Sequence, residues 1–479
     1  MARPTTSRAA LASAAALLLA GCASTDPHTA LRASADEARE RTGVQARLLR
    51  GDDDRRALAL EIDAMLKEPL GQDAAVRIAI LNHPGLQARY WDAGIAQADL
   101  AQAARLRNPS FGFSRMDGGG SREIERGVAL DLAGLLTMPL RQRMAARRHE
   151  ETTLQVAAAI ERHAIETRRA WIEAVAAGQA LDYARQVAAA ADAASELMER
   201  MALAGNASAL DLARESAFYA EAGAAVLRAA RERDAARERL TRQLGLWGAQ
   251  ANYALPERLP ELPAQPVELT GIERLALERR LDVRAARAAA AGTAADLGLT
   301  RATRMVNVLD LGYASKSETG QARSEGYEVA LELPLFDWGG ARVARAQALY
   351  MQALERVAET AVDARSQARA GYLGYRASYD LARQYRDHVI PLRKRISDET
   401  LLRYNGMLVS TFELLADARE QAAAVHAAIE ALKDFWLAEA GLQAALGARL
   451  PAAGPGQAQT QTQTQAHAHA HAHDNKEAQ

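Results

Sequence analysis

Apolar residues recur at helical spacing over most of the chain, and two long stretches, 140–203 and 341–404, contain few helix breakers. At about 1.5 Å per residue, a helix of roughly 64 residues is about 95 Å long. We expect such helices to pack sideways against others, because alanines at 157–159 and 188–191 permit close approach. The absence of a clean leucine heptad favours a sheet-like wall of helices, with a long coiled-coil stalk as the alternative.

Two shorter segments, at about 109–132 and 305–336, predict β-hairpins. Apolar residues alternate with acidic or small residues in one strand of each hairpin; in the first hairpin, Val128, Leu130 and Leu132 alternate with Ala129 and Asp131. In the second hairpin, Tyr327, Val329, Leu331 and Leu333 alternate with Glu328, Ala330 and Glu332. One face of each hairpin is therefore apolar, and the other is acidic or small. Taken alone, these strands also fit the half-buried sheet of a soluble protein.

Four strands are too few to cross a membrane as a barrel, because bacterial barrels begin at about eight strands. An open sheet edge in hydrocarbon leaves backbone groups unpaired. If the hairpins span a membrane, the chain must therefore oligomerise, and three copies of four strands supply twelve.

The predicted elements follow one plan twice, in residues 74–253 and 268–448. Each half contains a helix, a hairpin, a very long helix, a glycine turn and a returning helix. Residues 254–267 contain four prolines and predict a linker between the halves. Residues 22–73 precede the first half, and residues 449–479 form a tail rich in Gln, Thr and His that we expect to be disordered.

The two glycine turns carry similar sequences, LAGNASALDLAR at 203–214 and YNGMLVSTFELLADAR at 404–419. Ser208 with Asp211, and Ser410 with Glu413, have the spacing of a capping box. In this motif the hydroxyl and the carboxylate accept hydrogen bonds from backbone N–H groups where a helix begins. The sequence therefore predicts that helices restart after Ser208 and Ser410.

The N-terminus has the features of a bacterial lipoprotein signal. Arg3 and Arg8 precede a short apolar run that ends in Leu-Ala-Gly-Cys22. This run is too short to span a bilayer. We expect residues 1–21 to be removed and Cys22 to carry lipid, with a plain signal peptide as the alternative. Residues 22–73 would then form an N-terminal periplasmic segment. Because Cys22 is the only cysteine, internal disulfides are excluded.

Composition narrows the chemistry further. The 59 basic and 60 acidic residues give a net charge of -1 and are spread along the chain, which argues against nucleic-acid binding. The motifs of nucleotide-binding loops, zinc proteases and serine hydrolases are missing from the sequence, so we expect no enzymatic activity and no cofactor. Alternating imidazoles in the tail fit either metal binding or a repeat-expanded tail without a ligand. These residues are His467, His469, His471 and His473.

Three stretches resemble motifs of the TolC-like outer-membrane efflux factors. They are AAVRIAILNHPGLQARYWDAGIAQADLAQAARLRNPSFGF (74–113), LPLFDWGGARVARAQA (333–348) and RYNGMLVSTFELLADAREQ (403–421). The resemblance extends over about residues 70–448 in order and spacing. It implies a mostly α protein with a small β part, in which a homotrimer shares a 12-stranded transmembrane β-barrel that continues into an α-helical tunnel.

The resemblance also implies a function and partners. The protein would be a passive, gated duct in the outer membrane of a Gram-negative bacterium, in contact with outer-membrane lipid. Its tunnel would meet a periplasmic adaptor, also called a membrane fusion protein, and an inner-membrane pump of the resistance-nodulation-division type. Metal ions such as copper, or drugs, would be exported. The alternative is a lipid-anchored helical adaptor or stalk without a pore; a lipid-anchored hydrolase lacks any motif.

Several residues take roles from the same resemblance. The turns would lie at the periplasmic tip, with Gly205, Ser208 and Asp211 in the first turn and Gly406, Ser410 and Glu413 in the second. Acidic residues at these positions would narrow the tunnel entrance, and three copies of Glu413 would form a ring that favours cations. Helix capping alone is the alternative role of Asp211 and Glu413. The acidic strand face, with Asp131, Glu328 and Glu332, would line the barrel lumen.

The chain departs from the family pattern at two places. Gly406 stands one residue early and Met407 occupies the usual glycine position, so we expect adaptor contacts at this turn to differ in detail. Residues 279–282, Arg-Arg-Leu-Asp, lack the proline that usually follows the arginine. We therefore expect the helix there to be less sharply divided.

Overall fold

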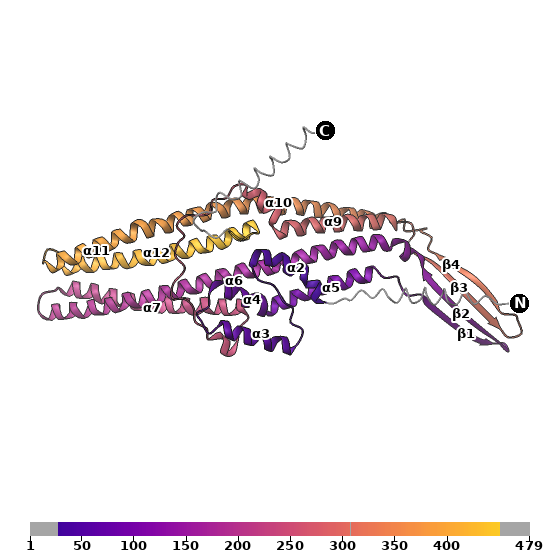
Figure 1. Cartoon of the computed structure of the whole chain (residues 1–479), viewed down its shortest axis with the longest axis horizontal. Coiled ribbons are helices and arrows are strands. Elements are labelled where there is room, and N and C mark those ends of the chain that lie inside the picture. The colour runs from indigo at the N-terminus through magenta and orange to yellow at the C-terminus, as the bar shows by residue number, and fades with distance from the viewer. Residues whose placement is uncertain (1–26, 307, 451–479) are drawn as a thin grey trace, which may run out of the picture.

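The computed structural model describes residues 27–306 and 308–450, which form one long body (Figure 1). A sheet lies at one end, two helical turns lie at the other, and shorter helices thicken the middle. Cys22 and the tail histidines His467, His469, His471 and His473 lie outside the described residues. The helices are α2 (Pro27–Thr42), α3 (Asp52–Met65), α4 (Gln72–Asn82), α5 (Pro84–Ala103), α6 (Leu132–Leu203), α7 (Ala209–Leu244), α8 (Ile272–Arg279), α9 (Leu281–Ala302), α10 (Gly340–Gln384), α11 (Ile390–Asn405) and α12 (Thr411–Leu446), with a short 3-10 helix η1 (Gly248–Ala251).

The longest element is α6, whose 72 residues extend roughly 108 Å at the usual helical rise. α7 returns along it from the first turn, and α12 returns along α11 and α10 from the second (Figure 1). Between α10 and α11, a π-helical turn, η2 (Tyr385–Val389), precedes Pro391. Proline has no N–H for the helical ladder, and the wider turn allows the helix to continue past it. The two long helices predicted from the sequence are confirmed.

Both halves contain a helix that is divided by one extended residue. His83 separates α4 from α5 with ψ 120°, and Arg280 separates α8 from α9 with ψ 129°. The expectation of a less sharp division at Arg280 is therefore wrong. Proline is not needed there, because the Asp282 carboxylate accepts hydrogen bonds from Arg280 Nε at 3.0 Å and from the Val283 N–H at 2.9 Å.

A left-handed glycine packs against each of these divisions. Gly245 follows α7 with φ 66°, and a Cβ atom there would lie 3.1 Å from the Cα of His83. Gly447 follows α12 with φ 63°, and its Cβ would lie 2.9 Å from the Cα of Arg280. Glycine permits both the positive φ and the close approach. The same backbone contact thus recurs in the two halves of the chain.

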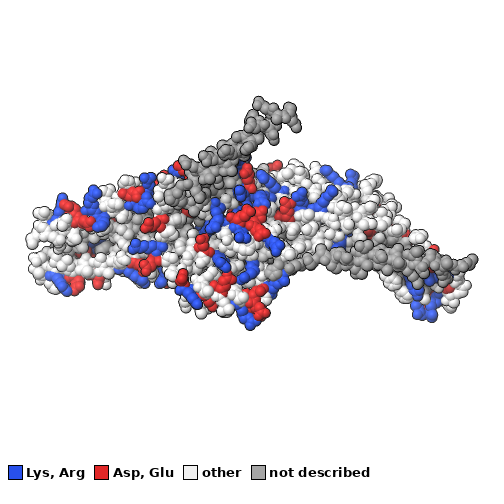
Figure 2. Space-filling view, in the orientation of Figure 1, with Lys and Arg blue, Asp and Glu red and all other residues white. Residues whose placement is uncertain are grey.

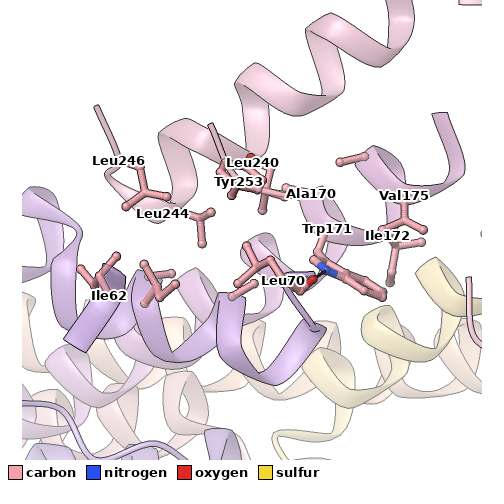
Figure 3. Close-up of a cluster of buried hydrophobic side chains, with 14 of the residues drawn as sticks. Ile62, Leu70, Ala170, Trp171, Ile172, Val175, Leu240, Leu244, Leu246 and Tyr253 are labelled. Atoms are coloured by element: carbon pink, nitrogen blue, oxygen red, sulfur yellow. Dashed lines mark hydrogen bonds between the residues drawn. The ribbon is translucent and has the colours of Figure 1, made fainter. Parts of the chain in front are cut away.

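An apolar core in the thick middle of the body joins α6 to α7 and to the N-terminal helices (Figure 3). Trp171 and Ile172 of α6 pack in one cluster with Leu240 and Leu244 of α7 and with Leu70. The indole N–H of Trp171 donates to the Leu70 carbonyl at 2.7 Å, which satisfies the ring's only donor. Since full burial of one such aliphatic side chain contributes about 2 kcal/mol, this cluster anchors the centre of α6.

Four strands form one antiparallel sheet in the order β1-β2-β3-β4. They are β1 (Ser110–Gly118), β2 (Ser121–Asp131), β3 (Leu309–Glu318) and β4 (Ser324–Leu331). The two hairpins are far apart in the sequence and pair through β2 and β3. Positive φ angles at Gly119 (59°) and Gly120 (83°) form the tight β1–β2 turn. β4 ends at Leu331, so the predicted extension of this strand to Leu333 is wrong; Pro334 lacks the N–H that a ladder needs.

Candidate functional site

The first helical turn, between α6 and α7, has a complete cap. Gly205 adopts φ 76°, and Ser208 stands at the N-cap of α7. The Asp211 N–H donates to Ser208 Oγ at 3.2 Å, and the Ser208 N–H donates to Asp211 Oδ2 at 3.3 Å. The predicted capping box is therefore confirmed at this turn, and the Asp211 carboxylate accepts one of its two hydrogen bonds.

The second turn, between α11 and α12, is built differently. Ser410 Oγ accepts from the Glu413 N–H at 3.3 Å, as a cap requires. Within the described residues, however, the Glu413 carboxylate returns no hydrogen bond to Ser410 N, so the prediction of a second complete capping box is wrong. Glu413 is exposed. Of the two acidic residues at the tips, only Glu413 has a carboxylate without a capping role.

Met407 adopts the left-handed conformation in this second turn. Its φ is 58°, and it is the one residue other than glycine with positive φ in the part of the chain that the structure describes. Gly406 has φ -82°, which any residue adopts. The displaced glycine noted in the sequence therefore leaves a methionine, 94% exposed, in the position that Gly205 occupies in the first turn.

The pairing register assigns the strand residues to two faces of the sheet. Val128 pairs with Phe111 and with Tyr313, and Tyr313 pairs with Tyr327, so these four side chains share one face. They are large, apolar and exposed. The opposite face carries six carboxylates and one lysine, namely Glu123, Glu125, Asp131, Asp310, Glu318, Glu328 and Lys316.

The three predicted lumen residues have different surroundings. Asp131 and Glu328 lie on the acidic face, and Glu328 is exposed. Glu332 lies just beyond β4, where its N–H donates to the Val308 carbonyl at 3.3 Å. Asp131 also caps α6, since it accepts from the Gly134 N–H at 2.5 Å, and it pairs with Arg107 at 3.3 Å. Asp131 thus has a structural role that the alternation pattern did not predict.

No family model matches the sequence, and no curated protein sequence matches it. Solved structures do match. A membrane protein from Pseudomonas aeruginosa superposes with a TM-score of 0.67 at 20% identity, over 78% of this chain and 93% of its own. The outer membrane protein VceC of Vibrio cholerae gives 0.66 at 15% identity, over 79% and 97%. The MtrE outer membrane channel of Neisseria gonorrhoeae gives 0.65 at 18% identity, over 78% and 88%.

The chain has the TolC-like outer-membrane channel fold. The resemblance found in the sequence motifs is therefore confirmed at the level of the fold. In this TolC-like chain, the sheet and the two helical turns occupy opposite ends of the body (Figure 1). Acidic and basic side chains are interspersed along the helices between them (Figure 2).

Near the tips of the TolC-like helices, one ion pair joins the first helical hairpin to the second. Glu215 of α7, only 2% exposed, pairs with Arg419 of α12. The guanidinium of Arg419 also lies over the Phe218 ring, 4.4 Å from its centroid. Sequence reasoning missed this contact, because nothing local indicates which helix faces Glu215.

A second unpredicted cluster lies where α7 ends on the division between α4 and α5. The rings of His83 and His163 are 4.3 Å apart, so His163 is not isolated on its helix. His163 Nε2 donates to the Gln243 carbonyl at 2.9 Å. Burial, together with the neighbouring His83, lowers the pKa of His163 to about 4. Burial likewise lowers the pKa of His83, against the opposing effect of Glu166.

Among residues 27–306 and 308–450, no three His, Cys, Asp or Glu side chains are grouped so as to hold a metal ion. Within the same ranges, every helix is too short or too polar to cross a membrane.

Proposed function

We propose that this chain is the outer-membrane channel of a tripartite efflux system, a passive and gated duct. The observation that best supports this proposal is an open four-stranded sheet, with one exposed apolar face, at the end of a rod of long helices. Phe113 and Tyr327 on this face are 58% and 85% exposed. Within the described chain, β1 and β4 each have one edge without a partner strand. In a homotrimer, pairing β1 of one copy with β4 of the next closes a barrel, satisfies these edges and places the apolar face in lipid.

The proposed organisation keeps two repeats, 74–253 and 268–448, joined by the linker 254–267. The recurring contacts of Gly245 with His83 and of Gly447 with Arg280 support this division. Residues 1–21 would be the signal peptide and Cys22 the lipid-modified residue, followed by the segment 22–73. Residues 449–479 would be the tail.

We further propose that the helical tips meet a periplasmic adaptor and, through it, an inner-membrane pump of the resistance-nodulation-division type. Apolar side chains at the tips support a protein partner. Leu203 is 89% exposed, Met407 is 94% exposed and Leu408 is 76% exposed. Apolar side chains gathered at one exposed end are typical of a protein contact surface.

Glu413 is the proposed gate residue, because its carboxylate is exposed and free of a capping bond. Conductance of the purified protein in planar bilayers tests both channel and gate. Glu413→Gln should lower the preference for cations over anions. Glu399→Gln is the matched control, since Glu399 lies near the same tip and already pairs with Arg403 at 3.0 Å. Equal selectivity of both variants would refute the gate assignment.

The same experiment tests the channel itself. Failure of the wild type and of the Asp211→Ala/Glu413→Ala variant to conduct would favour a helical adaptor or stalk without a pore. Crosslinking adds an independent measurement, because a stable monomer or dimer is incompatible with the proposed barrel. For the substrate, copper and zinc sensitivity of a deletion strain should be compared with its drug sensitivity, with and without residues 449–479.

A further inference from the structure

The apolar face of the sheet changes to an arginine-rich face toward the β1–β2 turn. Phe113 pairs with Arg126, Arg115 with Ile124, and Asp117 with Arg122, so the register places all of these on the face that carries Phe111 and Val128. Figure 2 shows basic side chains gathered over this hairpin. We call Arg115, Arg122 and Arg126 the arginine cluster.

The arginine cluster has more positive charge than its neighbours neutralise. Asp117 accepts from Arg122 Nε at 2.9 Å and from Arg115 Nε at 3.0 Å, so one carboxylate serves two guanidinium groups. Arg126 is exposed and has no hydrogen bond or ion pair among the described residues. The neighbouring hairpin adds no excess charge, because Arg323 pairs with Glu325 at 3.2 Å.

The arginine cluster lies at one end of a band of exposed apolar side chains on the same face of the sheet, at the end away from the helices. Arg126 pairs with Ser315, and Ser315 pairs with Glu325, which places these three residues in one row across the sheet. From Glu325 toward the helices, the exposed apolar residues are Tyr327, Val329, Leu331, Leu333 and Leu335. The first three of these residues lie in β4, which ends at Leu331, and Leu333 and Leu335 follow it, so the apolar side chains all lie on the helix side of the row that contains Arg126.

We propose that the arginine cluster binds the phosphate groups of phosphate-bearing glycolipids in the outer leaflet of the membrane. The proposal rests on the proposed function, since a channel with periplasmic helices has its hairpin turns on the outer side. Guanidinium groups match phosphate oxygens with paired N–H donors. The lipid chains then lie along the apolar band while the phosphates meet Arg126, which has no ion pair within residues 27–306 and 308–450.

Lipid binding by the full-length protein tests this inference. Purified protein in neutral detergent is titrated with lipopolysaccharide, and bound lipid is measured per chain by mass spectrometry. Since each basic residue at an anionic membrane surface changes affinity about fivefold, Arg126→Gln should bind about fivefold more weakly. Arg115→Gln together with Arg126→Gln should weaken binding further. Lys316→Gln is the matched control, because Lys316 is exposed in the same sheet but lies on the opposite face.

Two further arms identify the ligand group. Enzymatically dephosphorylated lipopolysaccharide should lose most of the binding, whereas millimolar inorganic phosphate should not displace the intact lipid. Equal binding by Arg126→Gln and Lys316→Gln, or by the two forms of the lipid, would overturn the proposal. Efficient displacement by inorganic phosphate would also overturn it, in favour of a simple anion site.

Conductance separates this inference from the proposed function. All variants should still form channels in planar bilayers, because the substituted side chains are exposed. If the channels conduct and lipid binding does not depend on the arginines, only the inference fails. If the wild-type protein neither inserts nor conducts, the proposed channel function fails.

Discussion

Replacement of Met407 by glycine should stabilise the turn between α11 and α12. An L-residue in the left-handed region costs roughly 1–2 kcal/mol, and Met407 holds φ 58° there. Glycine removes this strain, while its greater freedom in the unfolded chain offsets roughly 0.5–1 kcal/mol of the gain. Met407 is 94% exposed, so removal of its side chain loses little packing within the chain. The expected net gain is about 1 kcal/mol.

The reciprocal changes isolate the backbone effect. Gly205→Ala should destabilise the first turn by about 1 kcal/mol, because alanine is strained at a φ of 76°. An added Cβ would meet no atom within 4 Å, so the loss reports the backbone conformation alone. Gly406→Ala is the control. Its φ of -82° suits alanine, and its Cβ would be 3.5 Å from the nearest atom, the Arg403 carbonyl oxygen. This change should be neutral or slightly stabilising.

Hydrogen exchange at the turns measures these differences directly. The Leu408 N–H donates to Arg403 O, and the Asn206 N–H donates to Met201 O, each at 2.8 Å. A change of about 1 kcal/mol alters the local opening constant about fivefold. Met407→Gly should therefore slow exchange at Leu408, and Gly205→Ala should accelerate exchange at Asn206. Unchanged exchange in Met407→Gly, or damage from Gly406→Ala equal to that from Gly205→Ala, would refute the reasoning.

Three other predictions concern the helical body, and denaturant unfolding checks each. Gly447→Ala should lower the free energy of unfolding by about 2 kcal/mol or more, because its Cβ would lie 2.9 Å from the Arg280 Cα at a positive φ. Arg419→Met should cost about 2 kcal/mol by leaving Glu215 buried and unpaired, and adding Glu215→Leu should recover most of that loss. His163 has a pKa of about 4 when folded against 6.5 when unfolded, so stability should fall by about 3 kcal/mol as pH drops from 7.5 to 4. His163→Gln should remove that part of the pH dependence.

Local signals in the sequence predicted the parts of this fold that depend on local chemistry. Alternation at 327–331 predicted a strand with an exposed apolar face, and the Ser208-x-x-Asp211 spacing predicted a cap. Both are decided by neighbours within a few residues. The long helices followed equally well from the scarcity of breakers, since their alanines favour helix wherever they pack.

Features fixed by contacts between distant segments were missed. The division at Arg280 is supported by Gly447, which lies far along the chain, so the missing proline was a poor guide. The pairs His83–His163 and Glu215–Arg419 need the relative rotation of two helices, which periodicity does not determine. The prediction of a second capping box was wrong because the Ser-x-x-Glu spacing brings the Glu413 N–H to the Ser410 hydroxyl but does not determine where the Glu413 carboxylate points.

The contrast between the two turns bears on where the gate lies. The first turn follows every local rule, with glycine at the left-handed position and Asp211 bound into a complete cap. The second turn has a strained Met407 and leaves Glu413 free, although a glycine one residue later would remove the strain. Backbone strain that a single substitution could relieve is a reason to look for function at that position. An exposed methionine and a free carboxylate at one tip provide what a protein contact and a charged constriction require, so the α11–α12 turn is where both proposals should be tested first.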